Sequence, residues 1–227
     1  MRIGILGGTG PAGRALAARL ASAGFEVVIG SRSQDRARQI VDDLLADWPD
    51  RGLQLTGAEN ADAATAEVVV VATPWDSAPQ TAAALRESLR GKVVVSMANA
   101  LVRAGQEFQP LMLPRGSVAA NLQAALPDCR VAAAFHHIPA KELADLRRPV
   151  ESDVLICSDH SSAVEVTSEI VAKLPHLRPL QAGGLAMATP IESFTAVLLQ
   201  LNVTYKTRVA LKLTGISTPH ARDEPSA

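Results

Sequence analysis

A glycine-rich loop near the start of the chain limits the folds that this sequence can adopt. Residues 2–6 form a short apolar run and a helical pattern begins near residue 11, with the loop between them reading Gly8-Thr9-Gly10-Pro11-Ala12-Gly13. In a dinucleotide-binding turn, the first glycine allows the tight bend, the second lets a pyrophosphate approach the backbone, and the third lets the helix pack closely on the strand. Pro11 suits the first turn of a helix, whose N-terminus attracts phosphate. The context favours a nucleotide-binding unit over a glycine turn that binds nothing.

Strand-like and helical segments alternate over roughly the first 140 residues. Short apolar runs predict strands at residues 2–6, 26–30, 53–55, 67–72, 92–96 and 130–135. Amphipathic segments predict helices at residues 33–47, 78–89 and 117–125. This alternation predicts an α/β fold of the Rossmann type, with a doubly wound parallel sheet.

The pattern changes after residue 148, which predicts a small C-terminal α/β portion. Residues 153–157 and 177–181 are candidates for extending the sheet, and residues 161–174 predict a helix capped by Asp159 or Ser161. We therefore expect a dinucleotide-binding domain over residues 1–148 and a small domain over residues 149–217. The polar tail over residues 218–227 is expected to be disordered.

The last long helix is predicted over residues 191–213, where apolar side chains recur at steps of three and four residues. Such a stripe suits a lid over the sheet, an interface between two copies of the chain, or both. We therefore expect a homodimer.

The end of the second predicted strand lacks a typical acidic residue. An NAD-binding domain usually places Asp or Glu there to hold the ribose 2′-hydroxyl. This chain has Ser31 and Arg32 at that point, with Arg36 one turn later. No carboxylate at this point repels a 2′-phosphate, and two guanidinium groups can bind one. The sequence predicts NADP(H) rather than NAD(H), unless the arginines are only a solvated helix start.

Two further loops follow the carboxyl ends of predicted strands, where ligands bind in open α/β sheets. They contain Thr73-Pro74-Trp75 and Met97-Ala98-Asn99. We expect these loops to frame the nicotinamide. The alternative is a pair of ordinary turns, and for Trp75 simple packing explains the residue as well as ligand contact does.

Composition excludes several other classes of protein. The 22 basic and 23 acidic residues leave a net charge of −1, which predicts no general attraction to nucleic acid or to an anionic membrane. Apolar runs are far shorter than the roughly 20 residues of a membrane span. Cys129 and Cys157 have apolar neighbours, which predicts buried reduced thiols and no metal site. The early glycine loop interrupts any signal-peptide pattern, so we expect a cytoplasmic protein.

Several short stretches together resemble the NADPH-dependent reductases of the deazaflavin coenzyme F420, over nearly all of residues 1–216. They are the glycine loop, Gly30-Ser31-Arg32, Thr73-Pro74-Trp75, His136-His137-Ile138-Pro139-Ala140 and Ile191-Glu192-Ser193-Phe194-Thr195. The resemblance implies hydride transfer between NADP(H) and coenzyme F420, with NADP contacts at Thr9, Ser31, Arg32 and Arg36. It further implies that the deazaflavin ring stacks over the nicotinamide in a cleft closed by the C-terminal domain, and that His136, Ser193 and Thr195 make the polar contacts around the ring.

The resemblance leaves the binding site of the anionic F420 tail open. Members of this family tend to carry a basic residue near the position of Thr189, and this chain has none there. The remaining basic candidates are Arg103, Lys141, Arg147, Arg148, Lys206 and Arg208. Their spacing in the sequence favours none of them.

Two other functions fit the same nucleotide-binding half. A reductase of a small imine, ketone or metal complex would use His136, Ser193 and Thr195 around a smaller substrate. A sensor would bind NADPH without reducing anything. NADPH oxidation that depends on added deazaflavin, on small electrophiles, or on neither distinguishes the three.

Overall fold

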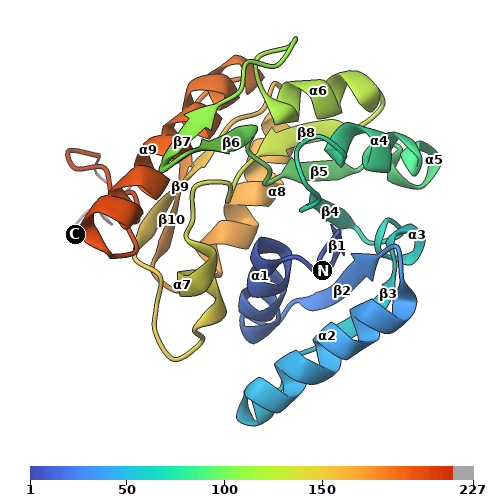
Figure 1. Ribbon diagram of the computed structural model, residues 1–227. Helices are drawn as coiled ribbons and strands as arrows, with labels where there is room; N and C mark the ends of the chain where they lie inside the picture. Colours follow the sequence, from blue (N-terminus) through green and yellow to red (C-terminus); the bar gives the residue numbers. More distant parts are fainter. Residues whose placement is uncertain (217–227) are drawn as a thin grey trace, which may run out of the picture.

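A parallel sheet forms the centre of the molecule, with the strand order β3-β2-β1-β4-β5-β8 (Figure 1). The computed structural model describes residues 1–216, so the predicted tail lies outside the described residues. The strands of this sheet are β1 (Arg2–Leu6), β2 (Glu26–Ser31), β3 (Leu55–Glu59), β4 (Val68–Val71), β5 (Val93–Ser96) and β8 (Arg130–Ala133). Strands β2 and β3 are added on one side of β1, and β4, β5 and β8 are added on its other side. This order is that of the Rossmann fold.

Helices cover both faces of the sheet. On one face lie α1 (Pro11–Ser22), α2 (Gln34–Asp47), α7 (Ala140–Ala144) and α8 (Ser161–Ala172). On the other lie α3 (Asn60–Ala63), α4 (Ala78–Ala83), α5 (Arg86–Leu89) and α6 (Val118–Ala125). The four valines of β4 are buried and alternate between the two faces, as expected for a strand covered on both sides.

The C-terminal strands form a separate small sheet rather than a full extension of the main one. Strands β9 (Ser152–Ile156) and β10 (Leu177–Gln181) pair in parallel. A single antiparallel bridge between Ala133 and Cys157 connects them to the end of β8. The chain then passes through a 3-10 turn, η2 (Leu185–Met187), into the last helix, α9 (Ala188–Tyr205).

The structure corrects the bounds of this last helix, which was predicted over residues 191–213. It begins three residues earlier and ends at Tyr205, because Lys206 adopts a left-handed conformation with φ of 51°. The following residues run beside β9, where the amide of Asp153 donates to the carbonyl of Leu211 at 2.7 Å. Two apolar residues assigned to the helical stripe, Val209 and Leu213, therefore lie outside the helix. No helix within residues 1–216 combines the length and apolar character needed to cross a bilayer.

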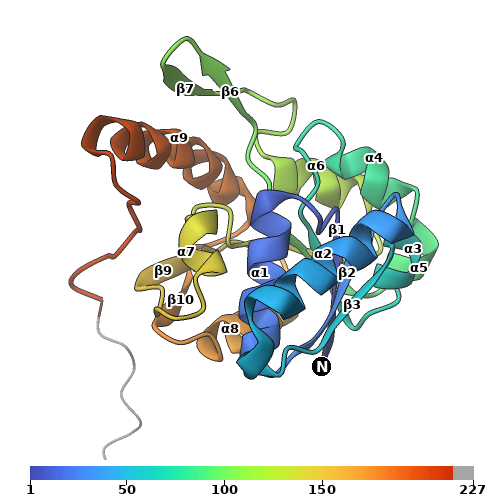
Figure 2. The same cartoon turned by 60° about the horizontal axis from the view of Figure 1, so that its bottom comes forward.

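Other differences from the predicted elements are local. The helix predicted over residues 78–89 breaks into α4 and α5 at Leu85, which leaves helical geometry and packs on the apolar core. His160 occupies the N-cap position of α8 without a side-chain capping bond, while Asp159 accepts a hydrogen bond from the amide of Leu185. Sequence patterns missed α3, α7, the 3-10 turn η1 (Pro49–Arg51) and the hairpin of β6 (Leu101–Ala104) and β7 (Glu107–Pro110). Figure 2 shows this hairpin projecting beyond the body of the molecule near α9.

Candidate functional site

A cavity of about 500 Å³ lies at the carboxyl ends of β1, β2, β4 and β5. Among the residues expected to bind nucleotide, those that line it are Thr9, Gly10, Pro11, Ala12, Ser31, Arg32, Arg36, Thr73, Pro74, Trp75, Met97, Ala98 and Asn99. Gly8 and Gly13 lie behind this wall. The cavity therefore brings together four chain segments that the sequence analysis had singled out separately.

The glycines of the loop have distinct physical roles. The left-handed turn occurs at Gly7, with φ of 68°, rather than at Gly8 as expected. A Cβ on Gly13 would lie 2.8 Å from the Cα of Gly8, so glycine is what lets α1 approach the strand. A Cβ on Gly10 would meet nothing closer than 3.7 Å. Open space in front of Gly10, beside the free amides of a helix N-terminus, fits a pyrophosphate.

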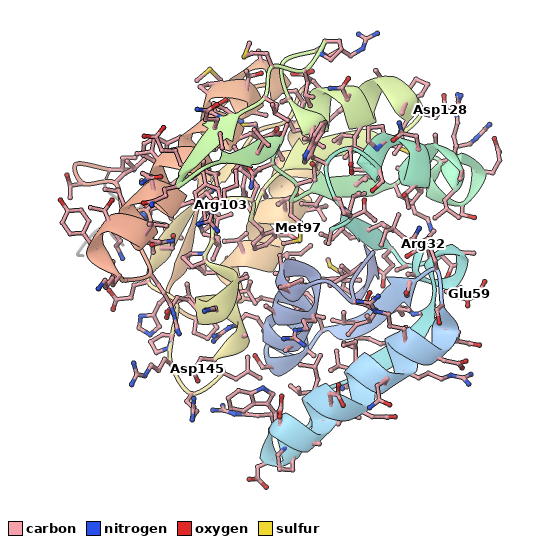
Figure 3. All side chains as sticks on the ribbon, in the orientation of Figure 1. Arg32, Glu59, Met97, Arg103, Asp128 and Asp145 are labelled. Atoms are coloured by element: carbon pink, nitrogen blue, oxygen red, sulfur yellow. The ribbon has the colours of Figure 1, made fainter. Side chains whose placement is uncertain are left out.

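Within residues 1–216, the only charged side chains in the cavity lining belong to Arg32 and Arg36. Both are exposed, and neither makes an ion pair within residues 1–216. Ser31 is buried beside them, and its hydroxyl accepts from the amide of Ser33. Figure 3 shows Arg32 at one side of the molecule and Met97 near its centre. The cavity thus has a cationic end suited to a phosphate and a largely uncharged remainder.

Asn60 is a lining residue that sequence analysis missed. Its side-chain oxygen accepts a hydrogen bond from the amide of Gly7 at 3.1 Å. It thereby holds the left-handed turn of the glycine loop from the start of α3. The two residues are 53 positions apart, and no motif connects them, so only the fold brings them together.

Several buried polar atoms at this edge of the sheet have no hydrogen-bond partner in the part of the chain that the structure describes. They are Thr73 Oγ1, Ser96 Oγ, Asn99 Oδ1 and both ring nitrogens of His136. Buried polar groups in proteins are nearly always paired, so such a cluster indicates where a ligand supplies partners. The side-chain amide of Asn99 donates to the carbonyl of His136 at 2.6 Å, which attaches the loop after β8 to the cavity wall.

The imidazole of His136 is almost completely buried. Burial, with a smaller contribution from neighbouring His137, lowers its pKa to about 3. His136 is therefore neutral near pH 7 and has one donor and one acceptor nitrogen to offer. His137 instead contacts the carbonyl of Asp153 at 2.9 Å. Of the two histidines, only His136 has both ring nitrogens unpaired.

Ser193 and Thr195 lie on α9 and do not line the 500 Å³ cavity. Thr195 is buried, and its hydroxyl donates to the carbonyl of Ile191 at 3.4 Å. The neighbouring residue on α9, Glu192, contacts α6. Its carboxylate accepts from the amides of Val118 at 2.8 Å and Ala119 at 3.2 Å. The start of α9 is therefore attached to α6, which follows β5 and its hairpin in the chain.

The two cysteines do not take part in this site. Both are buried and free. The thiol of Cys129 donates to the carbonyl of Leu89, and burial raises the pKa of Cys157 to about 11. Neither supplies a thiolate near pH 7. Within residues 1–216 no group of three or more His, Cys, Asp or Glu side chains is arranged to hold a metal ion.

Comparisons with known proteins agree with this geometry. A family model described as "NADP oxidoreductase coenzyme F420-dependent" matches residues 2–100. The F420-dependent NADP reductase of Methanothermobacter marburgensis is 38% identical over 215 residues, which cover 92% of this chain and 96% of that protein. The reductase of the same name from Methanothermobacter thermautotrophicus is 36% identical, with 92% and 93% covered.

A solved structure is similar over almost the whole length. It is the crystal structure of a putative F420-dependent NADP reductase from Arthrobacter sp. FB24, with a TM-score of 0.80 and 26% identity. The match covers 94% of this chain and 99% of the other. Because the full-length relatives exceed 30% identity over nine-tenths of the sequence, this chain belongs to the family of F420-dependent NADP reductases.

Proposed function

We propose that this protein transfers a hydride between NADP(H) and coenzyme F420. The observation that carries the proposal is the single cavity that joins the glycine loop, the Arg32–Arg36 pair and the loops after β4 and β5. Asn99, which lines this cavity, donates to the backbone carbonyl of His136, and the ring of His136 is itself unpaired. The family to which the chain belongs points to the same pair of cofactors.

In this proposal, the residues of the cavity bind and orient NADP(H). The open backbone at Gly10 and the N-terminus of α1 receive the pyrophosphate. Arg32, Arg36 and the Ser31 hydroxyl bind the 2′-phosphate by charge-assisted hydrogen bonds. Thr73 and Asn99, with their unpaired oxygens, bound the nicotinamide end. Among the described residues, the lining contains no carboxylate to oppose the phosphates.

On the acceptor side, His136, Ser193 and Thr195 hold the deazaflavin. The nicotinamide and deazaflavin rings supply the hydride donor and acceptor, so the reaction requires no protein nucleophile. The protein holds the two rings face to face, and alignment of that kind lowers the barrier by several kcal/mol. A neutral His136 donates or accepts a hydrogen bond at the edge of the ring without adding charge.

We place the boundary between the two functional parts at residue 148, as the sequence predicts. Support comes from the sheets, since β8 completes the nucleotide-binding sheet and β9 begins the other. Two buried free cysteines agree with a reducing compartment, so we propose that the protein works in the cytoplasm.

A homodimer is also part of this proposal. One face of α9 carries Phe194, Val197 and Tyr205, which are exposed by 41%, 47% and 71%. Their spacing of three and eight residues puts them on one stripe of the helix. Light scattering at micromolar concentration tests the dimer. A mass near 23.8 kDa, that of one chain, would refute it, and Val197→Asp is expected to shift a dimer to monomers.

The decisive test of the reaction is spectroscopic. NADPH oxidation is followed with oxidised coenzyme F420, with small imines and ketones, and with ferric chelates as separate acceptors. We expect turnover that depends on the deazaflavin. Turnover with a small electrophile alone would support the alternative reductase, and tight NADPH binding without turnover would support a sensor.

A further inference from the structure

Asn99 lies where the wall of the 500 Å³ cavity meets the loop that carries His136. Strands β5 and β8 pair as far as Ser96 and Ala133, and the amide of Ala134 then donates to the carbonyl of Ser96 at 3.0 Å. Farther along, the side-chain amide of Asn99 donates to the carbonyl of His136 at 2.6 Å. This side chain therefore continues the connection between the two segments beyond their backbone ladder.

The backbone of the His136 loop adopts a conformation that needs support. Phe135, directly before His136, is buried and has φ of 63°. Left-handed backbone is disfavoured for a bulky residue and persists where surrounding contacts hold it. Two side-chain contacts hold the residues that follow. Asn99 binds the carbonyl of His136, and the ring of His137 contacts the carbonyl of Asp153 on β9 at 2.9 Å. The first of these comes from the wall of the nucleotide cavity.

The oxygen of the same side chain is available to a ligand. Because the carbonyl of His136 can only accept, the nitrogen of the Asn99 amide faces it and Oδ1 points elsewhere. Oδ1 is buried and has no hydrogen-bond partner within residues 1–216. The carboxamide of nicotinamide carries an N–H donor, and Asn99 bounds the end of the cavity that receives the nicotinamide in the proposed function. A nicotinamide bound there can therefore donate to Oδ1.

We propose that Asn99 is a positioning residue that couples NADP(H) binding to the conformation of the His136 loop; this inference rests on the proposed function. The nicotinamide carboxamide donates to Oδ1 while Nδ2 donates to the carbonyl of His136. A hydrogen bond to the oxygen of an amide polarises the group and strengthens the bond that its N–H makes. NADP(H) thus stabilises the loop that receives the deazaflavin, and each ligand tightens the binding of the other.

The first test measures this coupling in an unreactive complex. NADP⁺ and oxidised F420 are both hydride acceptors, so they bind together without reacting. The dissociation constant of oxidised F420 is measured by calorimetry with and without saturating NADP⁺. For the wild type we expect NADP⁺ to tighten F420 binding by about fivefold to tenfold, a factor usual for coupled sites. Measuring NADP⁺ binding with and without F420 should give the same factor.

Asn99→Asp separates the two halves of the side chain. The carboxylate keeps an oxygen toward the nicotinamide, but it replaces the N–H donor with a second oxygen that repels the carbonyl of His136. We expect NADP⁺ affinity to stay within about threefold of the wild type and the coupling factor to fall below about twofold. The matched control is Asn121→Asp. The half-buried Asn121 donates to the carbonyl of Ser117 at 2.8 Å and does not line the cavity, so the control should keep the full factor.

Hydrogen exchange of the wild-type protein gives a second readout that needs neither a variant nor a deazaflavin. NADP⁺ alone should slow the exchange of the amides of residues 136–138, because it makes opening of the His136 loop less favourable. The same addition to Asn99→Asp should leave this exchange nearly unchanged. Exchange that NADP⁺ leaves unaltered in the wild type would overturn the proposed coupling.

The binding experiments can also contradict the role of Asn99. A coupling factor near one in the wild type, the full factor in Asn99→Asp, or an equal loss in Asn121→Asp would each overturn it while hydride transfer stands. Failure of the wild-type protein to reduce F420 with NADPH would instead refute the proposed function. The exchange of residues 136–138 would then still decide whether NADP⁺ acts on this loop through Asn99.

Discussion

The nucleotide end and the acceptor end of this molecule are built differently. The nucleotide end consists of loops that each follow a strand of one parallel sheet, and its critical contacts are between backbone atoms, as at Gly8 and Gly13. The acceptor end combines the loop after β8 with α7 and α9. Two of these segments, α7 and α9, are attached to helices that cover the sheet, through the buried polar side chains of Arg19 and Glu192. The first end is determined by local turns, and the second depends on a few long-range hydrogen bonds.

Arg19 is the strongest of these attachments. Its guanidinium extends from α1 and donates to the carbonyls of Glu142, Leu143, Asp145 and Arg148 around α7, at 2.7 to 3.0 Å. Arg19→Met would leave these carbonyls without partners, and we expect the free energy of unfolding to fall by about 4 kcal/mol. Urea unfolding at pH 7 measures it.

The matched control for this change is Arg14→Met, because Arg14 lies on the same helix but is exposed. It should alter stability by less than about 0.5 kcal/mol. A loss below about 1 kcal/mol for Arg19→Met would mean that water replaces the guanidinium, and that α7 needs no anchor on α1.

The attachment of α9 to α6 depends on Glu192, whose carboxyl group can titrate. Burial raises the pKa of its carboxyl from 4.5 to about 7. The folded protein therefore holds this proton more tightly than the unfolded chain, so stability falls as the pH rises from 4.5 to 7. Relative to Glu192→Gln, we expect the wild type to lose about 3 kcal/mol over this interval. Urea unfolding of both proteins at a series of pH values provides the comparison.

Glu165→Gln serves as the control, because Glu165 is exposed on α8. Its stability should run parallel to that of the wild type at every pH. A constant difference between wild type and Glu192→Gln would show that the amides of Val118 and Ala119 fully offset burial. The acceptor end would then be attached independently of pH.

At the nucleotide end, Arg32→Ala tests whether the Arg32 guanidinium, rather than the backbone of the glycine loop, makes the protein prefer NADPH to NADH. A lost charge-assisted contact should weaken NADPH binding by about tenfold to a hundredfold, with little effect on NADH. Arg38→Ala is the control, since Arg38 is exposed on α2 and does not line the cavity. Equal weakening of NADPH and NADH, measured by calorimetry, would contradict a 2′-phosphate contact.

The smallest expected effect is at Thr195. Thr195→Val keeps the volume and removes a hydroxyl that is buried beside the carbonyl of Ile191. Loss of one hydrogen bond to the deazaflavin should lower kcat/KM for F420 about tenfold and leave NADPH affinity unchanged. Steady-state kinetics with each substrate varied in turn measures both. An unchanged rate would assign Thr195 to helix packing alone.

Periodicity in the sequence predicted the strands of the sheet better than it predicted the β6–β7 hairpin and the end of helix α9. Strand β10 occupies the predicted residues 177–181, and β2 and β4 differ from prediction by a residue or two. Buried parallel strands are continuous apolar runs, which are easily recognised. The hairpin of β6 and β7 escaped notice because its strands are short and mostly exposed. Helix α9 ended early because Lys206 turns left-handed, an event that no apolar pattern signals.

The sequence by itself determined the glycine loop, the absence of an acid after β2 and hence the cationic end of the cavity, because each feature lies within a few consecutive residues. The tertiary structure alone decided that Asn60 holds the glycine loop and that Glu192 accepts the first amides of α6. These contacts join residues more than fifty positions apart. Their partners are fixed by the packing of the whole chain rather than by any local pattern.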